Sequence, residues 1–147
     1  MEESGAVVAK VAAFDDPGGD ADALLTLDSG EKYRVGRKAR LFGTWSRILR
    51  DLHRSGELVY VGVDTAAGTV NEILFPGEER IKRVAPRPEG DRLKVVFLMS
   101  PSLHYLRTGG PRFEEMRRIL EEAARTGARP LVTCDPDTQE IRDVRWP

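Results

Sequence analysis

Two stretches of the chain place apolar residues three or four positions apart, which is the spacing along one face of an amphipathic helix. The first begins at Phe42 and ends before Gly56, and the second begins near Phe113 and ends before Gly127. A glycine after the last apolar position is a frequent helix stop because it adopts a left-handed backbone at little cost. The pattern predicts two helices, with Pro111 just inside the start of the second, where proline is well tolerated.

Short apolar runs separated by turn-forming residues occupy the rest of the chain and predict strands. In the first half the predicted strands are 5–14, 23–28, 31–35, 58–64 and 69–75. In the second half they are 81–87, 92–99, 103–106 and the two arms of a hairpin within 131–147. Each half therefore predicts the order strand-strand-strand-helix-strand-strand.

The two halves also resemble each other residue by residue. Shifting the chain by 71 positions aligns 42–76 with 113–147 without a gap, and nine of the 35 pairs are identical, where about two are expected by chance. The same shift sets 23–29 against 94–100, and closer to the N-terminus the register drifts. We interpret the similarity as an internal tandem duplication, with a chance likeness of two helix-hairpin segments as the alternative.

The last predicted strand of each half shares an irregular spacing. Its apolar residues are separated by three positions and then by two: Val70, Ile73, Phe75 and Ile141, Val144, Trp146. A regular strand keeps one face at a spacing of two, so the pattern predicts a bulge after the first apolar residue. The aromatic residue that ends each series is expected to plug one end of a hydrophobic core.

These features predict an α+β protein built from two repeats, 1–78 and 79–147. A unit of about 70 residues buries only about 60% of its unfolded surface, so the repeats are expected to share an apolar interface in one pseudo-twofold body. The order of elements is also that of the OB fold, a small Greek-key barrel. Two OB-like barrels are therefore the alternative to two helix-covered open sheets, which the short strands favour.

Composition narrows the class of protein. Of the 147 residues, 40% are hydrophobic and 32% charged, which is typical of a soluble globular chain. No apolar run approaches the length of a membrane span, and two acids open the chain where a signal peptide needs bases. A single cysteine excludes an internal disulfide. We expect a cytoplasmic protein without a membrane partner.

Charge is distributed unevenly along the first half. Residues 1–28 carry seven acids and one base, whereas 30–54 carry eight bases and two acids; from 95 to 147 eight arginines meet eight acids. The basic stretch is a candidate site for nucleic acid or another anion. Its candidate residues are Lys32, Arg34, Arg37, Lys38, Arg40, Arg47 and Arg50. The favoured alternative is that these cations pair with the N-terminal acids.

Two aromatic residues of this region, Tyr33 and Trp45, are candidates for stacking on bases. Trp45 lies on the apolar side of the predicted helix and is expected in the core. Tyr33 and His104 are separated by the repeat distance and are expected at equivalent, exposed or half-buried strand positions.

Candidate catalytic and metal-binding residues are few. The acidic loop 15–22 lacks the ligand spacing of a calcium-binding EF-hand and is expected to be a solvated hairpin loop. Cys134 has no histidine placed by sequence to activate it, since His53 and His104 both lie far along the chain, so we expect a structural cysteine.

Two acidic positions recur in both repeats. Asp64 and Asp135 are expected to cap hairpin turns, and Glu72 and Asp143 to face water. The alternative is a general acid and base at a pseudo-symmetric cleft. The sequence contains no nucleotide-binding, nucleophile or zinc motif. No metal, no cofactor and no catalytic residue is therefore predicted.

The sequence favours a binding protein over an enzyme. Its leading hypothesis is contact with a protein partner or with a second copy of the chain. The first alternative is weak nucleic-acid or other polyanion binding through 32–54. The second is a small enzyme with its site between the two halves.

Overall fold

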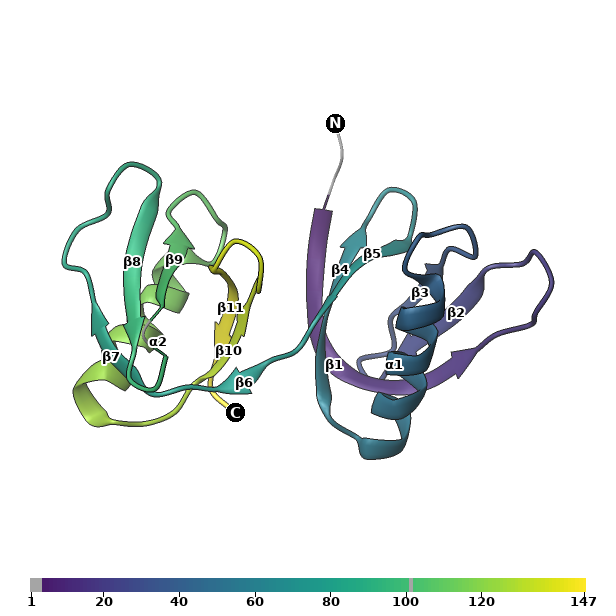
Figure 1. Cartoon of the computed structure of the whole chain (residues 1–147), viewed down its shortest axis with the longest axis horizontal. Helices are drawn as coiled ribbons and strands as arrows, with labels where there is room; N and C mark the ends of the chain where they lie inside the picture. Colours follow the sequence, from purple (N-terminus) through teal and green to yellow (C-terminus); the bar gives the residue numbers. More distant parts are fainter. Residues whose placement is uncertain (1–3, 101) are drawn as a thin grey trace. The chain divides into compact units, whose positions relative to one another are not determined.

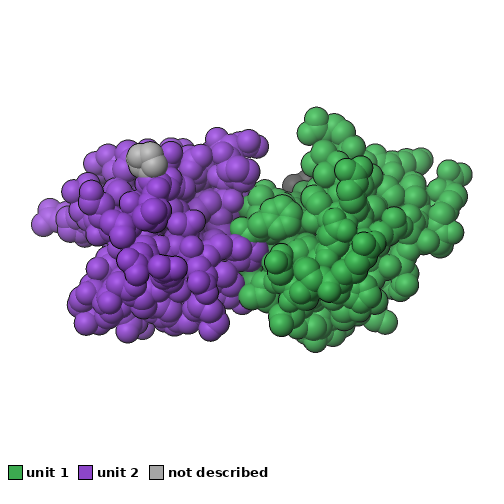
Figure 2. Space-filling model, turned by 60° about the horizontal axis from the view of Figure 1, so that its bottom comes forward, with its two compact units in different colours: residues 1–75 green, residues 76–147 purple. Residues whose placement is uncertain are grey.

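The computed structural model describes residues 4–100 and 102–147 and divides the chain into two compact units, Met1–Phe75 and Pro76–Pro147 (Figure 2). In the part described, each unit contains one helix and one antiparallel-rich sheet. The predicted α+β class is confirmed. Neither helix within the described residues is both long enough and apolar enough to span a bilayer.

Unit 1 is a closed five-stranded barrel with a helix between its third and fourth strands (Figure 1). Its elements are β1 (Ser4–Asp15), β2 (Ala23–Leu27), β3 (Lys32–Val35), α1 (Phe42–Ser55), β4 (Leu58–Asp64) and β5 (Thr69–Leu74). The barrel order is β1-β2-β3-β5-β4, an OB-like arrangement.

The expectation of an open sheet is wrong for this unit because β1 is 12 residues long. Lys10 pairs with Leu58 of β4, and the next residue, Val11, pairs with Leu27 of β2. A single strand thus bonds both neighbours in succession and closes the barrel.

The core of unit 1 follows directly from strand alternation and helix periodicity. Leu25 and Val35 point inward from β2 and β3, while Trp45 and Leu49 are buried on α1. The helix ends at Gly56, whose φ of 71° is left-handed and whose N–H donates to the carbonyl of Leu52 at 2.9 Å. The predicted helix stop is confirmed.

Unit 2 contains six strands and one helix in its described residues. They are β6 (Gly77–Glu78), β7 (Ile81–Val84), β8 (Arg92–Phe97), β9 (Leu103–Arg107), α2 (Phe113–Thr126), β10 (Leu131–Cys134) and β11 (Glu140–Arg145). The sheet order is β6-β10-β11-β9-β8-β7. The helix starts after Arg112, so Pro111 lies before the helix and not inside it.

The two edge strands of this sheet, β6 and β7, are separated only by Glu79 and Arg80. The Glu79 N–H donates to the Pro130 carbonyl at 3.1 Å, and the Arg80 carbonyl accepts from the Leu98 N–H at 2.8 Å. Together β6 and β7 act as one interrupted strand. They pair with β10 and β8, which correspond to β4 and β2, the two neighbours of β1 in unit 1. The short β6 was not predicted.

Both predicted bulges are present. In unit 1, Gly62 pairs with Glu72 and Val63 with Val70, which leaves Asn71 as the extra residue. In unit 2 the register shifts at the equivalent place, between Thr133 and Cys134. The parallel pairs β3–β5 and β9–β11 also recur.

Strands β2 and β8, which are equivalent in the two units, match at a different shift from the one that aligns the helices. Leu25 pairs with Tyr33, and Val95 pairs with His104. Leu25 therefore corresponds to Val95, 70 residues on, so the alignment of 23–29 with 94–100 is wrong by one residue. The turn between β8 and β9 is one residue longer than the turn between β2 and β3.

The two aromatic residues expected to plug the cores do not do so. Phe75 is 56% exposed and Trp146 is 40% exposed. Each follows the last residue of its strand, Leu74 or Arg145, and therefore lies beyond the strand alternation that turns side chains toward the core.

Candidate binding surfaces

Arg37 of the predicted anion site holds the loop between β1 and β2. Its guanidinium forms an ion pair with Asp16, donates to the Ala21 carbonyl at 3.0 Å and lies 4.4 Å from the centre of the Phe42 ring. Its backbone N–H donates to the carboxylate of Asp22 at 2.9 Å. The hydrogen bond from Arg37 is the main cause of a lowered pKa at Asp16. Arg37 is therefore structural.

The other six predicted cations divide into two sets. Arg50 lies 3.5 Å from Asp16, and Arg34 donates to the Ala67 carbonyl at 2.6 Å. The remaining four are exposed and form no ion pair with any described residue: Lys32, Lys38, Arg40 and Arg47. Arg37 and Arg50 thus meet the acidic N-terminal segment, as the favoured alternative expected.

The aromatic side chains considered for base stacking belong to the core of unit 1. Trp45 is buried, and Tyr33 is half-buried against the same cluster. The Tyr33 hydroxyl donates to Glu31, and burial together with this carboxylate raises the pKa of Tyr33 to about 12. The expectation that Trp45 lies in the core is confirmed.

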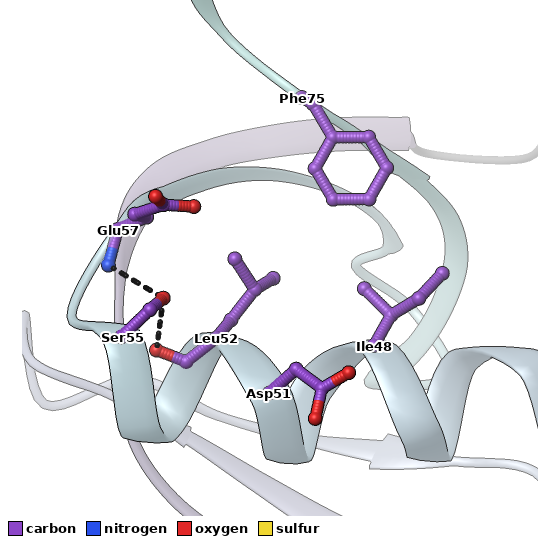
Figure 3. A pocket seen from close by; sticks show the side chains of 6 residues that line it. All are labelled: Ile48, Asp51, Leu52, Ser55, Glu57 and Phe75. Carbon is purple, nitrogen blue, oxygen red and sulfur yellow. Dashed lines mark hydrogen bonds between the residues drawn. The ribbon is translucent and has the colours of Figure 1, made fainter.

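A pocket of about 300 Å³ lies between α1 and the end of β5 (Figure 3). Its lining residues are Ile48, Asp51, Leu52, Ser55, Glu57 and Phe75. The exposed Phe75 ring faces the aliphatic side chains of Ile48 and Leu52 across the opening (Figure 3). This site was not predicted from the sequence, because the spacing of Phe75 indicated a core residue.

Acidic groups stand at the rim of the pocket. Asp51 and Glu57 are exposed, and the cation nearest to Asp51, Arg54, is 4.0 Å away. The Glu57 N–H donates to the Ser55 hydroxyl at 3.3 Å, which in turn donates to the Leu52 carbonyl at 3.4 Å (Figure 3). These bonds hold the rim where α1 ends. The site combines an apolar floor with negative charge.

The remaining candidate residues have structural environments. Cys134 is half-buried, and desolvation followed by the charge of Glu79 raises its pKa to about 12, which disfavours a thiolate nucleophile. His104 is buried, stacks on Phe97 at 4.1 Å and contacts the Ser102 carbonyl through Nδ1 at 3.1 Å. Desolvation lowers the pKa of His104, and its expected exposure is wrong.

The recurring acids also take structural roles. Asp64 accepts backbone N–H groups of Ala66 and Ala67, and Asp135 accepts those of Asp137 and Thr138, as predicted for turn caps.

Asp143, expected in water, is buried because Arg112 and Arg145 form ion pairs with it. Across the described ranges, 4–100 and 102–147, no three histidine, cysteine or acidic side chains gather as metal ligands would.

Comparison with known proteins finds no matching family model, no similar curated protein and no similar solved structure. A small barrel hosts many unrelated functions, so the fold alone identifies none of them. The surfaces of the chain itself are therefore the guide to its function.

Proposed function

We propose that the chain is a binding protein that contacts a partner protein through the pocket of unit 1. The observation that carries the proposal is the exposed Phe75 ring facing Ile48 and Leu52 across a pocket of about 300 Å³. Apolar clefts with a few polar groups at the edge are the usual form of a binding site. Aromatic side chains, phenylalanine included, are also enriched in protein–protein interfaces relative to the rest of the surface.

The rim defines the partner's chemistry. Asp51 and Glu57 place two carboxylates beside an apolar floor, so the complementary segment carries a bulky apolar side chain next to a lysine or arginine. The apolar side chain of the partner would fill the space under Phe75. Its lysine or arginine would remain at the solvent-exposed rim, beside the two carboxylates. Such rim charges mainly guide association and select partners.

The proposal is tested by selecting a displayed random-peptide library on the full chain and remeasuring enriched sequences as synthetic peptides. We expect enriched peptides to pair a bulky apolar residue with a basic one. Phe75→Ala should weaken their binding at least tenfold, because it removes one wall of the pocket. Asp51→Asn with Glu57→Gln should weaken it less and reduce its salt dependence.

Trp146→Ala is the matched control, since Trp146 occupies the place of Phe75 in unit 2 and is also exposed. It should leave peptide binding unchanged. Selection of no common sequence, or of peptides indifferent to Phe75→Ala, would contradict the proposal. Peptides that respond equally to both substitutions would point to non-specific apolar contact and also contradict it.

We further propose that the two units arose by tandem duplication. Gly56 and Gly127 end the helices with the same left-handed backbone, and both second hairpins have a bulge at the same register. The interrupted strand of unit 2 bonds the same neighbours as β1 in unit 1. Independent assembly of so many irregular features in one order is improbable.

Polyanion binding by the 32–54 stretch remains the alternative proposal. Only Lys32, Lys38, Arg40 and Arg47 support it, because the other three candidates already bond to unit 1 itself. Replacing Lys32, Lys38 and Arg40 by glutamine should abolish retention on a polyanion column if this stretch is the site.

A further inference from the structure

The outer face of β8 and β9 in unit 2 carries a compact group of cations. Leu93, Val95 and Phe97 alternate into the core, so Arg92 and Lys94 point outward. On β9 the same alternation turns Leu103, Tyr105 and Arg107 outward.

Strand register places these side chains in adjacent rows. Arg92 lies opposite Arg107, and Lys94 lies opposite Tyr105. Strand β7 lies on the other side of β8 (Figure 1). Its Arg83 pairs with Val96 of β8. We call Arg83, Arg92, Lys94, Tyr105 and Arg107 the β8–β9 face.

This surface belongs to a strongly basic segment of the chain. Residues 80–107 contain seven bases and two acids, a bias hidden when charges are counted only from residue 95. Two arginines directly opposite each other on neighbouring strands repel. An anion between Arg92 and Arg107 would relieve that repulsion.

The cations of the face are only weakly neutralised by the protein. Lys94 lies 3.1 Å from Glu89, Arg107 lies 2.9 Å from Glu140, and Arg92 lies 4.0 Å from Asp91. The basic groups of these three pairs are well exposed. Exposed pairs of this kind contribute little energy and exchange readily for a phosphate.

The β8–β9 face also contains an aromatic ring, that of Tyr105, beside its cations. The Arg92 guanidinium lies 5.4 Å from the centre of the Tyr105 ring, so a planar ring and a planar cation are layered on the surface. Nucleic-acid bases stack on both kinds of plane. Val96 and the exposed Leu103, which pair next to Tyr105, extend the apolar part of the surface.

Unit 1 provides an internal comparison because its equivalent surface has different chemistry. Where unit 2 has Lys94 and Tyr105, unit 1 has Leu24 and Arg34, which also lie opposite each other. Arg34 is bonded to the Ala67 carbonyl. The equivalent surface of unit 1 also carries cations, and it is the outward tyrosine and the facing pair of arginines that distinguish unit 2.

We propose that the β8–β9 face binds single-stranded nucleic acid, with Arg83, Arg92, Lys94 and Arg107 contacting phosphates and Tyr105 stacking on a base. The proposal uses unit 2 alone and does not depend on the pocket of unit 1. Four phosphate contacts give a salt slope of about −2.8 for a single strand, which is about a 50-fold loss of affinity between about 50 and 200 mM salt.

The test is fluorescence anisotropy of a labelled oligothymidine, about 20 nucleotides long, titrated with the full chain at several salt concentrations. The variant Arg92→Gln, Lys94→Gln, Arg107→Gln should bind about 100-fold more weakly at about 0.1 M salt and show a much shallower salt slope. Tyr105→Leu should weaken binding between about 5-fold and about 150-fold and leave the salt slope unchanged.

The matched control is Arg118→Gln, Arg125→Gln, Arg129→Gln, three exposed arginines of unit 2 outside the β8–β9 face, which changes the net charge of −1 by the same amount. It should bind like the wild type. Equal loss in both triple variants would show a net-charge effect and overturn the proposal, as would the absence of wild-type binding at low salt.

A second ligand separates nucleic acid from other polyanions. Inorganic polyphosphate should bind the Tyr105→Leu variant as well as it binds the wild type. Loss of oligothymidine binding in the charge variant but not in Tyr105→Leu would indicate a bare anion site and overturn the nucleic-acid proposal. Should the triple variant fail to fold, Lys94→Gln alone should reduce the salt slope by about 0.7, and an unchanged slope overturns the proposal.

Discussion

Arg112, at the start of α2, ties the helix to β11 and offers a quantitative test of how unit 2 is held together. Its guanidinium forms ion pairs with Glu115 at 2.9 Å and with Asp143, and donates to the Val144 carbonyl at 3.1 Å. The Asp143 side chain is only 7% exposed and also lies 2.7 Å from Arg145. Arg112→Leu would leave this buried carboxylate with one cation instead of two.

The expected loss follows from the burial of the pair. Removing one partner of a buried ion pair costs about 3–5 kcal/mol when it leaves an uncompensated charge. Arg145 still compensates Asp143, and the Arg112 side chain is 34% exposed, so screening reduces the effect. We expect Arg112→Leu to lower the free energy of unfolding of unit 2 by about 2 kcal/mol, the size of one hydrogen bond to a charged group.

Urea unfolding followed by tryptophan fluorescence can measure this loss in the correct unit. In a Trp45→Phe background, Trp146 is the remaining tryptophan and reports on unit 2. With a slope of about 1 kcal/mol per molar urea, the midpoint should fall by about 2 M. In a Trp146→Phe background, Trp45 reports on unit 1, and its transition should not move.

A double-mutant cycle with Asp143→Asn then isolates the pair. The two substitutions should be coupled by at least about 0.5 kcal/mol, because each removes the same contact. Strictly additive effects, or an unchanged unit 2 midpoint in Arg112→Leu, would refute the reasoning.

Three further changes test other parts of the structure. Burial lowers the pKa of His104, so the unfolded chain binds a proton at a higher pH than the folded chain does, and unit 2 should lose stability as the pH falls below about 6.5. His104→Tyr should flatten the pH dependence of the urea midpoint. An unaltered pH dependence would show that His104 is not its cause. Thr133→Val removes a buried hydroxyl that lacks a hydrogen-bond partner in the described part of the chain. It should raise the free energy of unfolding by about 1 kcal/mol, measured by thermal unfolding. A lower melting temperature would contradict this prediction. Gly62→Ala places a methyl group 3.0 Å from Cβ of Glu72, an atom fixed by the backbone, and 2.9 Å from Oδ1 of Asn71. It should cost unit 1 about 1–3 kcal/mol in urea unfolding, and a neutral result would show that the bulge yields.

Local features of the fold could be predicted from the sequence because neighbouring residues determine them. Gly56 ends α1 through its own left-handed backbone, and Asp135 caps a turn formed by the next few residues. The bulge in β5 was visible as a change from a spacing of three to a spacing of two. None of these features requires knowledge of distant contacts.

Barrel closure depends on distant contacts and was predicted only as the alternative to an open sheet. Nothing in the sequence near Lys10 and Val11 indicates that β1 changes partner there from β4 to β2. The exposure of Phe75 has the same origin, since an apolar residue at a regular spacing reads as core until the strand is seen to end at Leu74.

The proposed site in unit 2 was overlooked for a different reason. Acids and arginines balance from residue 95 to residue 147, and the five cations from Lys82 to Lys94 lie before that range. Strand register was also needed, because only pairing shows that Arg92 faces Arg107. A count made over the whole of β7, β8 and β9 would have found the charge, although not its geometry.

The contrast between the two units bears on both proposals. A barrel that had only to fold would gain little from Arg92 and Arg107 lying opposite each other, because facing like charges destabilise a strand pair. It would also gain little from a Phe75 ring left in water, since burying such a ring is worth about 2 kcal/mol or more. The first arrangement forgoes stability that unit 1 does not forgo at the same position, where Gly36 replaces Arg107. The second arrangement recurs in unit 2, where Trp146 occupies the place of Phe75 and is also exposed. We infer that a ligand offsets the cost at each site, and that the two ligands differ because one site is acidic and apolar and the other is basic and aromatic.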